Sequence, residues 1–213
     1  MQILTYNRIM PEAQPSRRTQ AERTRASREK IIHAAIEFFA RQGFRGAKMA
    51  DIARAAGLSE PGLLHHFPSK THLLMDVLEE RDRIDKGRSH AILQQDGSHF
   101  LDVVTELVEH NETVPGLVRL FTILVAESVS QEHPAHEFFI QRYQRTRVDM
   151  VRTLTQAQQA GEIRADIPAE TLTVLVFAMM DGLQVQWLLE PEKISMAGMF
   201  RAFMGLLESG VEK

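Results

Sequence analysis

The chain has 213 residues, of which 44% are hydrophobic, 25% are charged and none is cysteine, and its formal net charge at pH 7 is −3. The lack of cysteine excludes disulfides, thiolate zinc sites and cysteine nucleophiles. No apolar run approaches the roughly 20 residues of a membrane span, and the first 20 residues lack the order of a signal peptide, so we expect a globular cytoplasmic protein with no membrane partner.

Charge is divided unevenly along the chain. Residues 17–54 carry ten Lys and Arg against four Asp and Glu, whereas residues 71–213 carry thirteen against twenty-two. A basic segment before an acidic body is typical of a protein that places one end on a polyanion. An Arg-rich first helix that is simply exposed to solvent would give the same charge balance. The residue pattern must therefore decide between this alternative and a segment that binds a polyanion.

The N-terminal part predicts an arm followed by a helix. Residues 1–22 contain prolines and show no hydrophobic period, which indicates a flexible basic arm. From about residue 23, apolar residues recur with helical spacing up to Phe39. Gly43 is expected to end this helix in a left-handed cap, and Phe44 can fold back onto the helix end.

Two short helices and a long one should follow. Residues 49–56 are rich in helix formers, and Gly57 ends that segment in a tight turn. Ser59 is placed to cap a third helix of about two turns, which must stop before Pro68. Ser69 can then cap the long fourth helix.

Helix, tight turn and short helix together form the pattern of a DNA-binding helix-turn-helix. Gly57 permits the turn angle, while Ala53 and Leu58 are small and apolar where the two helices must cross closely. This geometry lets the second helix project into a DNA major groove.

Beyond residue 90 only helical periodicity is found, and no alternating run indicates a hairpin. Breaks are expected near Gly97 and at residues 114–116, 132–134, 160–168 and 190–191. About five further helices remain, which predicts an all-α fold of about nine helices.

Three segments together resemble the N-terminal domain of TetR-family regulators. They are residues 28–44 (REKIIHAAIEFFARQGF), 51–59 (DIARAAGLS) and 65–70 (HHFPSK). The resemblance implies a three-helix helix-turn-helix DNA-binding domain over residues 23–70 and a helical ligand-binding and dimerisation domain over residues 71–213. The implied function is that of a repressor, which binds palindromic double-stranded operator DNA as a homodimer and is released by a small-molecule effector.

The resemblance also implies which residues contact DNA. Residues 59–66 would be the recognition helix, with the first helix and the arm close to phosphates. The expected DNA-binding residues are Arg25, Lys48, Met49, Ser59, Pro61, Gly62, His65, His66 and Lys70, with Arg17, Arg18 and Arg23 of the arm tracking phosphate or a minor groove.

Two positions depart from the family pattern. Lys48 stands where the family usually has Thr or Ser, and a lysine cannot cap the second helix in the same way. Leu64 stands where the family usually has Tyr, so a hydroxyl is missing, and we expect Leu64 to pack inward. Residues 59–66 contain no Arg, Asn or Gln for a bidentate base contact, so sequence preference must depend on few groups.

His65 and His66 have alternatives to DNA contact. One could pack against Phe67 in the core while the other is simply exposed. Together with His72 they could bind a metal, but the spacing matches no common site and no carboxylate is obviously placed. We therefore expect no metal and no cofactor.

The C-terminal half is rich in Met and aromatic residues, which more often form core than line a pocket. The resemblance favours a ligand cavity, and the candidate lining residues are Phe121, Glu127, Met150, Phe177, Asp181 and Trp187. Arg119, Glu127 and Asp181 lie in apolar stretches, where exposed salt bridges or interface caps explain each of them better than contact with a ligand. The charge of the ligand is therefore not predicted.

Residues 180–189 are apolar on more than one face, which indicates a helix with two partners. The resemblance implies that helices over residues 172–189 and 194–207 pair across a two-fold axis, with Gly182 and Gly198 allowing close approach. The expected interface residues are Met180, Gly182, Leu183, Trp187, Met199 and Phe203. A monomer whose own core covers both faces is the alternative.

Two other classes of function remain to be weighed. An enzyme would need a motif such as Gly-x-Ser-x-Gly, a Gly-rich phosphate loop or His-Glu-x-x-His, and the sequence has none of these. The pair His133 and His136 encloses Pro134, which suggests a helix start instead. An interaction module that does not bind DNA would lack the steep salt dependence of DNA affinity.

Overall fold

The computed structural model describes residues 19–93 and 100–208, and within these ranges the chain forms nine helices and no strand. The helices are α1 (Gln20–Gly46), α2 (Met49–Ala55), α3 (Glu60–His66), α4 (Lys70–Leu93), α5 (Phe100–Thr113), α6 (Pro115–Glu127), α7 (His136–Gln159), α8 (Ala169–Leu189) and α9 (Met196–Glu208). The predicted all-α class is confirmed. The expected break at Gly97 and the arm residues Arg17 and Arg18 lie outside the described residues.

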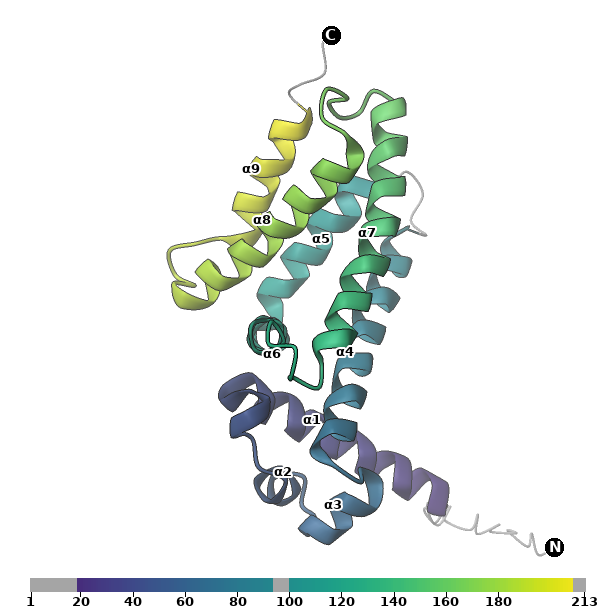
Figure 1. Cartoon of the computed structure of the whole chain (residues 1–213), viewed down its shortest axis with the longest axis vertical. Coiled ribbons are helices and arrows are strands. Elements are labelled where there is room, and N and C mark those ends of the chain that lie inside the picture. The colour runs from purple at the N-terminus through teal and green to yellow at the C-terminus, as the bar shows by residue number, and fades with distance from the viewer. Residues whose placement is uncertain (1–18, 94–99, 209–213) are drawn as a thin grey trace, which may run out of the picture.

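The helices are arranged in two tiers (Figure 1). The lower tier holds α1, α2 and α3, and the upper tier, called the body here, holds α5 to α9, with α6 seen end-on between the tiers. The long α4 starts beside α3 and runs up into the body. The lower tier is therefore joined to the body both by α4 and by the crossing of α1 and α6.

α1 begins earlier than the predicted residue 23 because Thr19 and Glu22 form a capping box. The Thr19 hydroxyl accepts the Glu22 amide at 3.2 Å, and the Glu22 carboxylate accepts the Thr19 amide at 2.7 Å. These bonds satisfy amides that a helix start leaves unpaired. Residues 20–22 consequently belong to the helix and not to the expected arm.

The far end of α1 breaks at Gly43, whose φ of +68° lies in the left-handed region that favours glycine. The predicted left-handed residue is confirmed, although one more helical turn follows before Ala47. The Phe44 ring lies 6.0 Å from the Phe39 ring, which confirms that Phe44 folds back onto the helix.

One hydrophobic core joins the helix-turn-helix to the body. It contains Ile31, Leu63 and Leu74 from the lower helices and α4, together with Leu120 of α6 and Phe139 of α7. Apolar packing therefore does not stop at residue 70, the predicted domain boundary. It continues from α3 through α1 into α6 and α7.

A second core fills the body between α5, α7, α8 and α9, around Leu154, Leu172 and Phe200. Its helix α8 is long and apolar enough to cross a membrane by length and composition, contrary to the expectation that no such run exists. In this fold α8 packs against α6, α7 and α9. The core helix of a globular protein passes the same test, so α8 by itself does not indicate a membrane protein.

Replacing Gly43 with alanine should cost more stability than the same change at Gly57. Both glycines have positive φ, so each variant should lose about 1–2 kcal/mol through left-handed strain. A Cβ at Gly57 would meet nothing within 4 Å, whereas at Gly43 it would lie 2.2 Å from the Glu127 Oε1. The carboxylate must then move and lose its bond to the Phe44 amide, which adds about 1.5–3 kcal/mol.

Urea unfolding of the two variants measures this difference. Equal losses of stability at Gly43 and Gly57 would show that the Glu127 contact contributes nothing.

Candidate nucleic-acid interface and effector site

α3 lies at the lower end of the molecule, after the turn at Gly57 (Figure 1). The Ser59 side chain is its N-cap and accepts the Gly62 amide at 3.2 Å, which confirms the predicted start. Leu63 is fully buried and attaches α3 to the core. α3 ends at His66, just before the buried Phe67, as the following Pro68 predicts.

The outward face of α3 carries Pro61, Leu64 and His65, all of them exposed. The expectation that Leu64 packs inward is wrong, because 40% of this residue is exposed. Successive residues of a helix point about 100° apart, and Leu63 already occupies the inward position. α3 therefore presents a large apolar side chain to its surroundings.

Arg28 of α1 holds the end of α3 in place. Its guanidinium donates to the His66 carbonyl at 3.0 Å, pairs with Asp76 of α4 and lies 4.4 Å from the centre of the Phe67 ring. One side chain thus connects α1, α3 and α4. Sequence analysis missed this role, because the partners lie 38 or more positions further along the chain.

The His66 ring is half-buried and lies edge-on to the His65 ring, with 5.6 Å between ring centres. Burial lowers the His66 pKa, and the nearby His65 and Arg28 lower it further. His66 is therefore neutral at pH 7 and can act as a hydrogen-bonding group. His72 Nδ1 lies 2.8 Å from the Ser69 hydroxyl at the start of α4.

Lys70 is turned toward the protein. Its ammonium donates to the Ala47 carbonyl at 2.9 Å and to the Arg45 carbonyl at 3.3 Å, and it lies 4.7 Å from the centre of the Phe44 ring. Burial lowers the Lys70 pKa, and the charge of Glu127 opposes this effect. The contacts seen for Lys70 are thus made with the end of α1.

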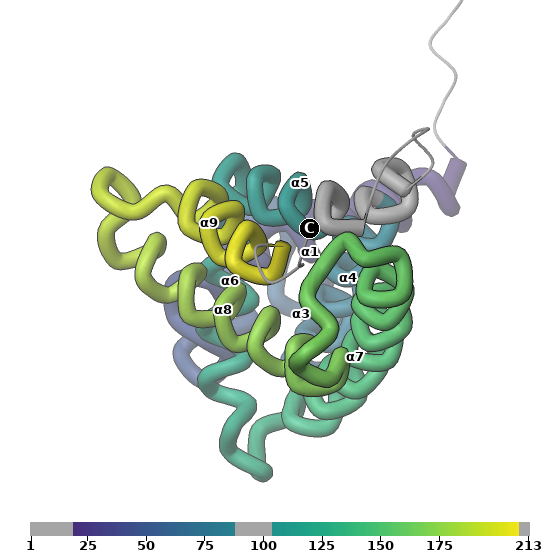
Figure 2. The backbone as a smooth tube through the Cα atoms, turned by 90° about the horizontal axis from the view of Figure 1, so that it is seen from above, coloured from purple at the N-terminus to yellow at the C-terminus, as the bar shows by residue number. Residues whose placement is uncertain are grey.

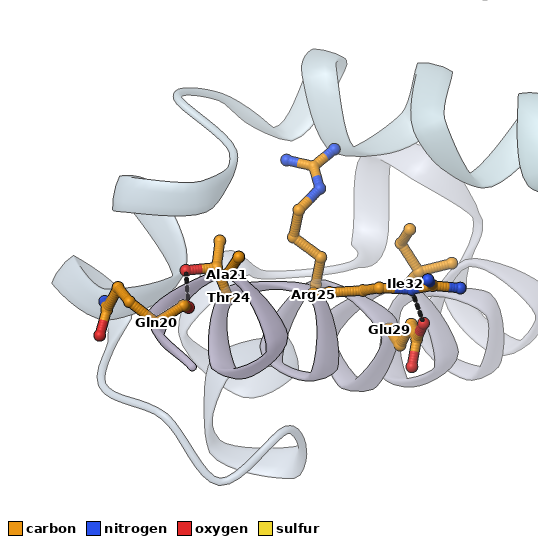
Figure 3. Close-up of a pocket in the computed structure, with 7 residues that line it drawn as sticks. Gln20, Ala21, Thr24, Arg25, Glu29 and Ile32 are labelled. Atoms are coloured by element: carbon orange, nitrogen blue, oxygen red, sulfur yellow. Dashed lines mark hydrogen bonds and ion pairs between the residues drawn. The ribbon is translucent and has the colours of Figure 1, made fainter. Parts of the chain in front are cut away.

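Arg25 of α1 and Lys48, just before α2, are both exposed and both precede α3 in the sequence. Arg25 forms an ion pair with Glu29 at 2.9 Å along a shallow hollow of α1 (Figure 3). Such an exposed pair is worth about 1 kcal/mol or less, so Arg25 can exchange its partner for a phosphate. Lys48 makes no side-chain cap bond to α2, as predicted, and the next residue, Met49, is half-buried.

A cluster of charged side chains lies inside the body, where α4 meets α6 and α7. Arg81 and Arg142 lie over the Phe121 ring, at 4.0 Å and 4.7 Å from its centre. Arg142 pairs with Asp82 at 2.8 Å, and Arg81 pairs with Asp85 at 3.0 Å. Burial lowers the Arg81 pKa to about 10, so Arg81 remains charged at pH 7.

Tyr143 and Asp181 extend this cluster toward α8. The Tyr143 hydroxyl donates to the Asp181 carboxylate at 2.7 Å, and the Phe177 ring lies 6.1 Å from the Tyr143 ring. Burial raises the pKa of both Tyr143 and Asp181. We call Arg81, Arg142, Tyr143 and Asp181, with Phe121 and Phe177, the body cluster.

The structure brings three of the six candidate ligand residues together, namely Phe121, Phe177 and Asp181. Met150 and Trp187 are instead buried in the second core. Sequence analysis missed Arg81, Arg142 and Tyr143 of the body cluster, although acidic and basic residues at helical spacing over 81–85 were an available signal.

Glu127 lies apart from the body cluster, where α1 crosses α6. Its carboxylate accepts the Phe44 amide at 2.7 Å and lies 3.7 Å from the His133 Nε2. The predicted ligand residue Glu127 thus contacts the lower tier, whereas Arg119 of the same helix is exposed.

α8 and α9 lie side by side along one flank of the body (Figure 2). Their exposed large apolar residues are Val174, Leu175, Val185, Leu189, Met199 and Leu206. We call this set the flank face.

The expected interface residues are only partly on the flank face. Met199 belongs to it, and Met180, Gly182 and Phe203 are half-buried. Leu183 and Trp187 are only 6% and 7% exposed because they pack in the second core, so their assignment to a surface is corrected.

Comparison with known proteins covers both tiers. A family model for bacterial regulatory proteins of the tetR family matches residues 31–77, and one for the BetI-type transcriptional repressor C-terminal domain matches residues 99–211. The transcriptional regulator TtgR of Pseudomonas putida is 26% identical over 197 residues, which cover 85% of this chain and 89% of TtgR.

Two further matches differ in extent. The regulator CymR of Pseudomonas putida is 43% identical over 65 residues, 30% of this chain and 32% of CymR. A transcriptional regulator from Saccharomonospora viridis, solved in complex with choline, has a TM-score of 0.74 and 24% identity, covering 88% of this chain and 98% of that one. This solved structure shows the same fold.

Replacing Asp181 with asparagine should change how stability depends on pH. The Asp181 pKa is raised above 3.8 in the folded protein. As pH rises from 3.8 toward this raised pKa, the carboxyl group ionises first in the unfolded chain, and the folded protein therefore loses stability. The variant lacks this loss, so its melting temperature relative to the wild type should rise from about pH 4 to about pH 7.

Asp166→Asn is the control, because the bond from Arg164 lowers the Asp166 pKa and stability is then lost as pH falls. Because this loss occurs below about pH 4, its melting temperature relative to the wild type should stay level from about pH 4 to about pH 7. A pH-independent difference for Asp181→Asn would refute the prediction.

Proposed function

This chain belongs to the tetR family of bacterial regulatory proteins, and from that premise we propose that it is a repressor that binds a palindromic operator as a homodimer and is released by a small-molecule effector. It is a transcriptional regulator and not an enzyme. The observation that carries the proposal is the exposed α3, fixed by Arg28 on a basic lower tier opposite an acidic body. Because its target is DNA, we place it in the cytoplasm.

In the proposed complex α3 enters the major groove, and the flanking cations contact phosphates. Arg25 and Lys48 are exposed for phosphate contact, and Arg23 is exposed two residues before Arg25. The groove would be met by Ser59, Pro61, Gly62, His65 and His66, with Met49 beside them. Lys70 would support DNA binding indirectly, because it holds the end of α1 against α4.

We propose that the flank face joins two copies of the chain. An exposed set of large apolar side chains on two adjacent helices gains free energy when a second copy covers it. Two joined recognition helices bind a palindrome far more tightly than one, because the second contact forms at high effective concentration.

We propose that the effector binds at the body cluster. The cluster joins aromatic rings to hydrogen-bonding and charged groups, which is the usual make-up of a small-molecule site. In the related Saccharomonospora viridis regulator the bound small molecule is choline.

α4 offers a path from the body cluster to α3. It carries Asp82, which pairs with Arg142 of α7, and Asp76, which pairs with Arg28 below. An effector that displaces Arg142 would release α4 and shift the end of α3. The free energy of such coupling is typically about 1–3 kcal/mol.

Lys48→Ala should weaken operator binding and reduce its salt dependence. Removing one phosphate contact lowers the slope of log affinity against log salt by about one per half-site. Arg28→Ala should weaken binding with an unchanged slope, because Arg28 positions α3 and does not contact phosphate. The measurement is a fluorescence titration of a duplex that the wild type selects from a random library.

Lys193→Ala, at an exposed lysine between α8 and α9 of the body, is the matched control and should leave affinity and slope unchanged. A wild-type affinity that does not fall as salt rises would refute the DNA-binding proposal.

Placing a charge on the flank face should separate the dimer. Leu189→Glu combined with Met199→Glu buries two carboxylates at the proposed contact, which is costly without partners. Sedimentation should show a single chain, and operator affinity should fall by at least about 100-fold. Val148→Glu, at an exposed apolar residue of α7, should stay dimeric. If the double variant remains a dimer, the flank face is not the interface.

A further inference from the structure

We propose that Leu64 determines operator specificity by contacting the C5 methyl group of a thymine in the major groove. The inference rests on the proposed function and adds to it the chemistry of the contacted base. The observation behind it is that Leu64, a large apolar residue, is exposed at a position of α3 where a polar residue would also fit.

The position of Leu64 is fixed from three sides. Leu63 next to it is fully buried, the Ser59 cap holds the first turn of α3, and Arg28 holds the His66 carbonyl at the last turn. α3 can therefore neither roll Leu64 into the core nor withdraw it from the surface. Leu64 therefore contacts any DNA that binds to the outward face of α3.

The outward face offers little polar chemistry to a base. Pro61 lies one turn before Leu64 and is apolar, and the Ser59 Oγ already accepts the Gly62 amide, so its O–H is the remaining polar group of that side chain. Guanine, adenine and cytosine are recognised in the major groove through hydrogen bonds to their edges. Thymine alone adds an apolar methyl group there, and apolar side chains recognise it.

The neighbouring charges support a position inside the groove. Lys48 is exposed at the start of α2, and Arg25 on α1 holds only an exposed, weak ion pair. Phosphate contacts by Arg25 of α1 and by Lys48 at the start of α2 would hold the outward face close to the base edges. His65, exposed beside Leu64, can then form a hydrogen bond to an adjacent base.

The test uses a duplex that the wild type selects from a random library. Each thymine is replaced in turn by deoxyuridine, which removes only the methyl group, and affinity is measured by fluorescence anisotropy. For the wild type, one symmetry-related thymine per half-site should lose about fourfold in affinity on replacement, the value of one buried methyl-sized group. Leu64→Ala should bind the thymine duplex more weakly and show no loss at that position.

Two controls separate Leu64 from its surroundings. Val148→Ala, on the exposed side of α7, should keep the full deoxyuridine effect. Pro61→Ala should also keep it, and if Pro61→Ala abolishes the effect while Leu64→Ala retains it, the assignment to Leu64 is overturned. Unchanged unfolding temperature and sedimentation of Leu64→Ala show that the variant keeps its fold and assembly.

The remaining outcomes distinguish this inference from the proposed function. A tightly bound duplex in which no thymine responds to deoxyuridine overturns the Leu64 contact and leaves the proposed function standing. Failure to select any duplex overturns the proposed function and the inference together.

Discussion

The position of α3 depends on the crossing of α1 and α6. At this junction the positive φ of Gly43 turns the Phe44 amide toward the Glu127 carboxylate, which accepts it at 2.7 Å. Around this bond the apolar core runs without interruption from Leu63 of α3 to Phe139 of α7. The lower tier is therefore a packed continuation of the body, and α3 takes its orientation from that packing.

α4 provides the second connection, and its contacts are ionic. Arg28 and Arg142 attach its two halves to α1 and α7 through Asp76 and Asp82. The Arg142–Asp82 pair is mostly buried, whereas the Arg28–Asp76 pair is partly exposed. A buried ion pair adds little net stability, because removing the charges from water offsets their attraction, yet loss of one partner is costly. These pairs suit the coupling proposed above, in which an effector displaces Arg142 and releases α4.

Local signals in the sequence predicted most of the helical architecture. The cap at Ser59, the glycine at Gly43 and the proline at Pro68 act within a few residues, and the structure confirms each of them. The capping box of Thr19 and Glu22 gave a similar local signal that the sequence analysis did not use. Helix ends are thus decided largely by neighbours in the chain.

The site could be predicted only in part, because its geometry depends on distant partners. Which of Leu63 and Leu64 faces the core is set by how α3 packs on α1, and burial of Trp187 is set by how α8 packs in the second core. Glu127 was expected to meet a ligand, but its partner Phe44 lies 83 positions earlier in the chain. Residue type and spacing were enough to single out these residues as candidates. Which partner each one contacts is determined by the packing of the helices.

Amide hydrogen exchange at Phe44 tests the junction most directly. We predict that this amide is protected as strongly as the buried α6 amides of Leu120 and Leu124, because its exchange requires α1 to separate from α6. Glu127→Ala should remove the protection at Phe44 first. Exchange of the wild-type Phe44 amide at the rate of an exposed loop, with α6 still protected, would contradict a fixed junction.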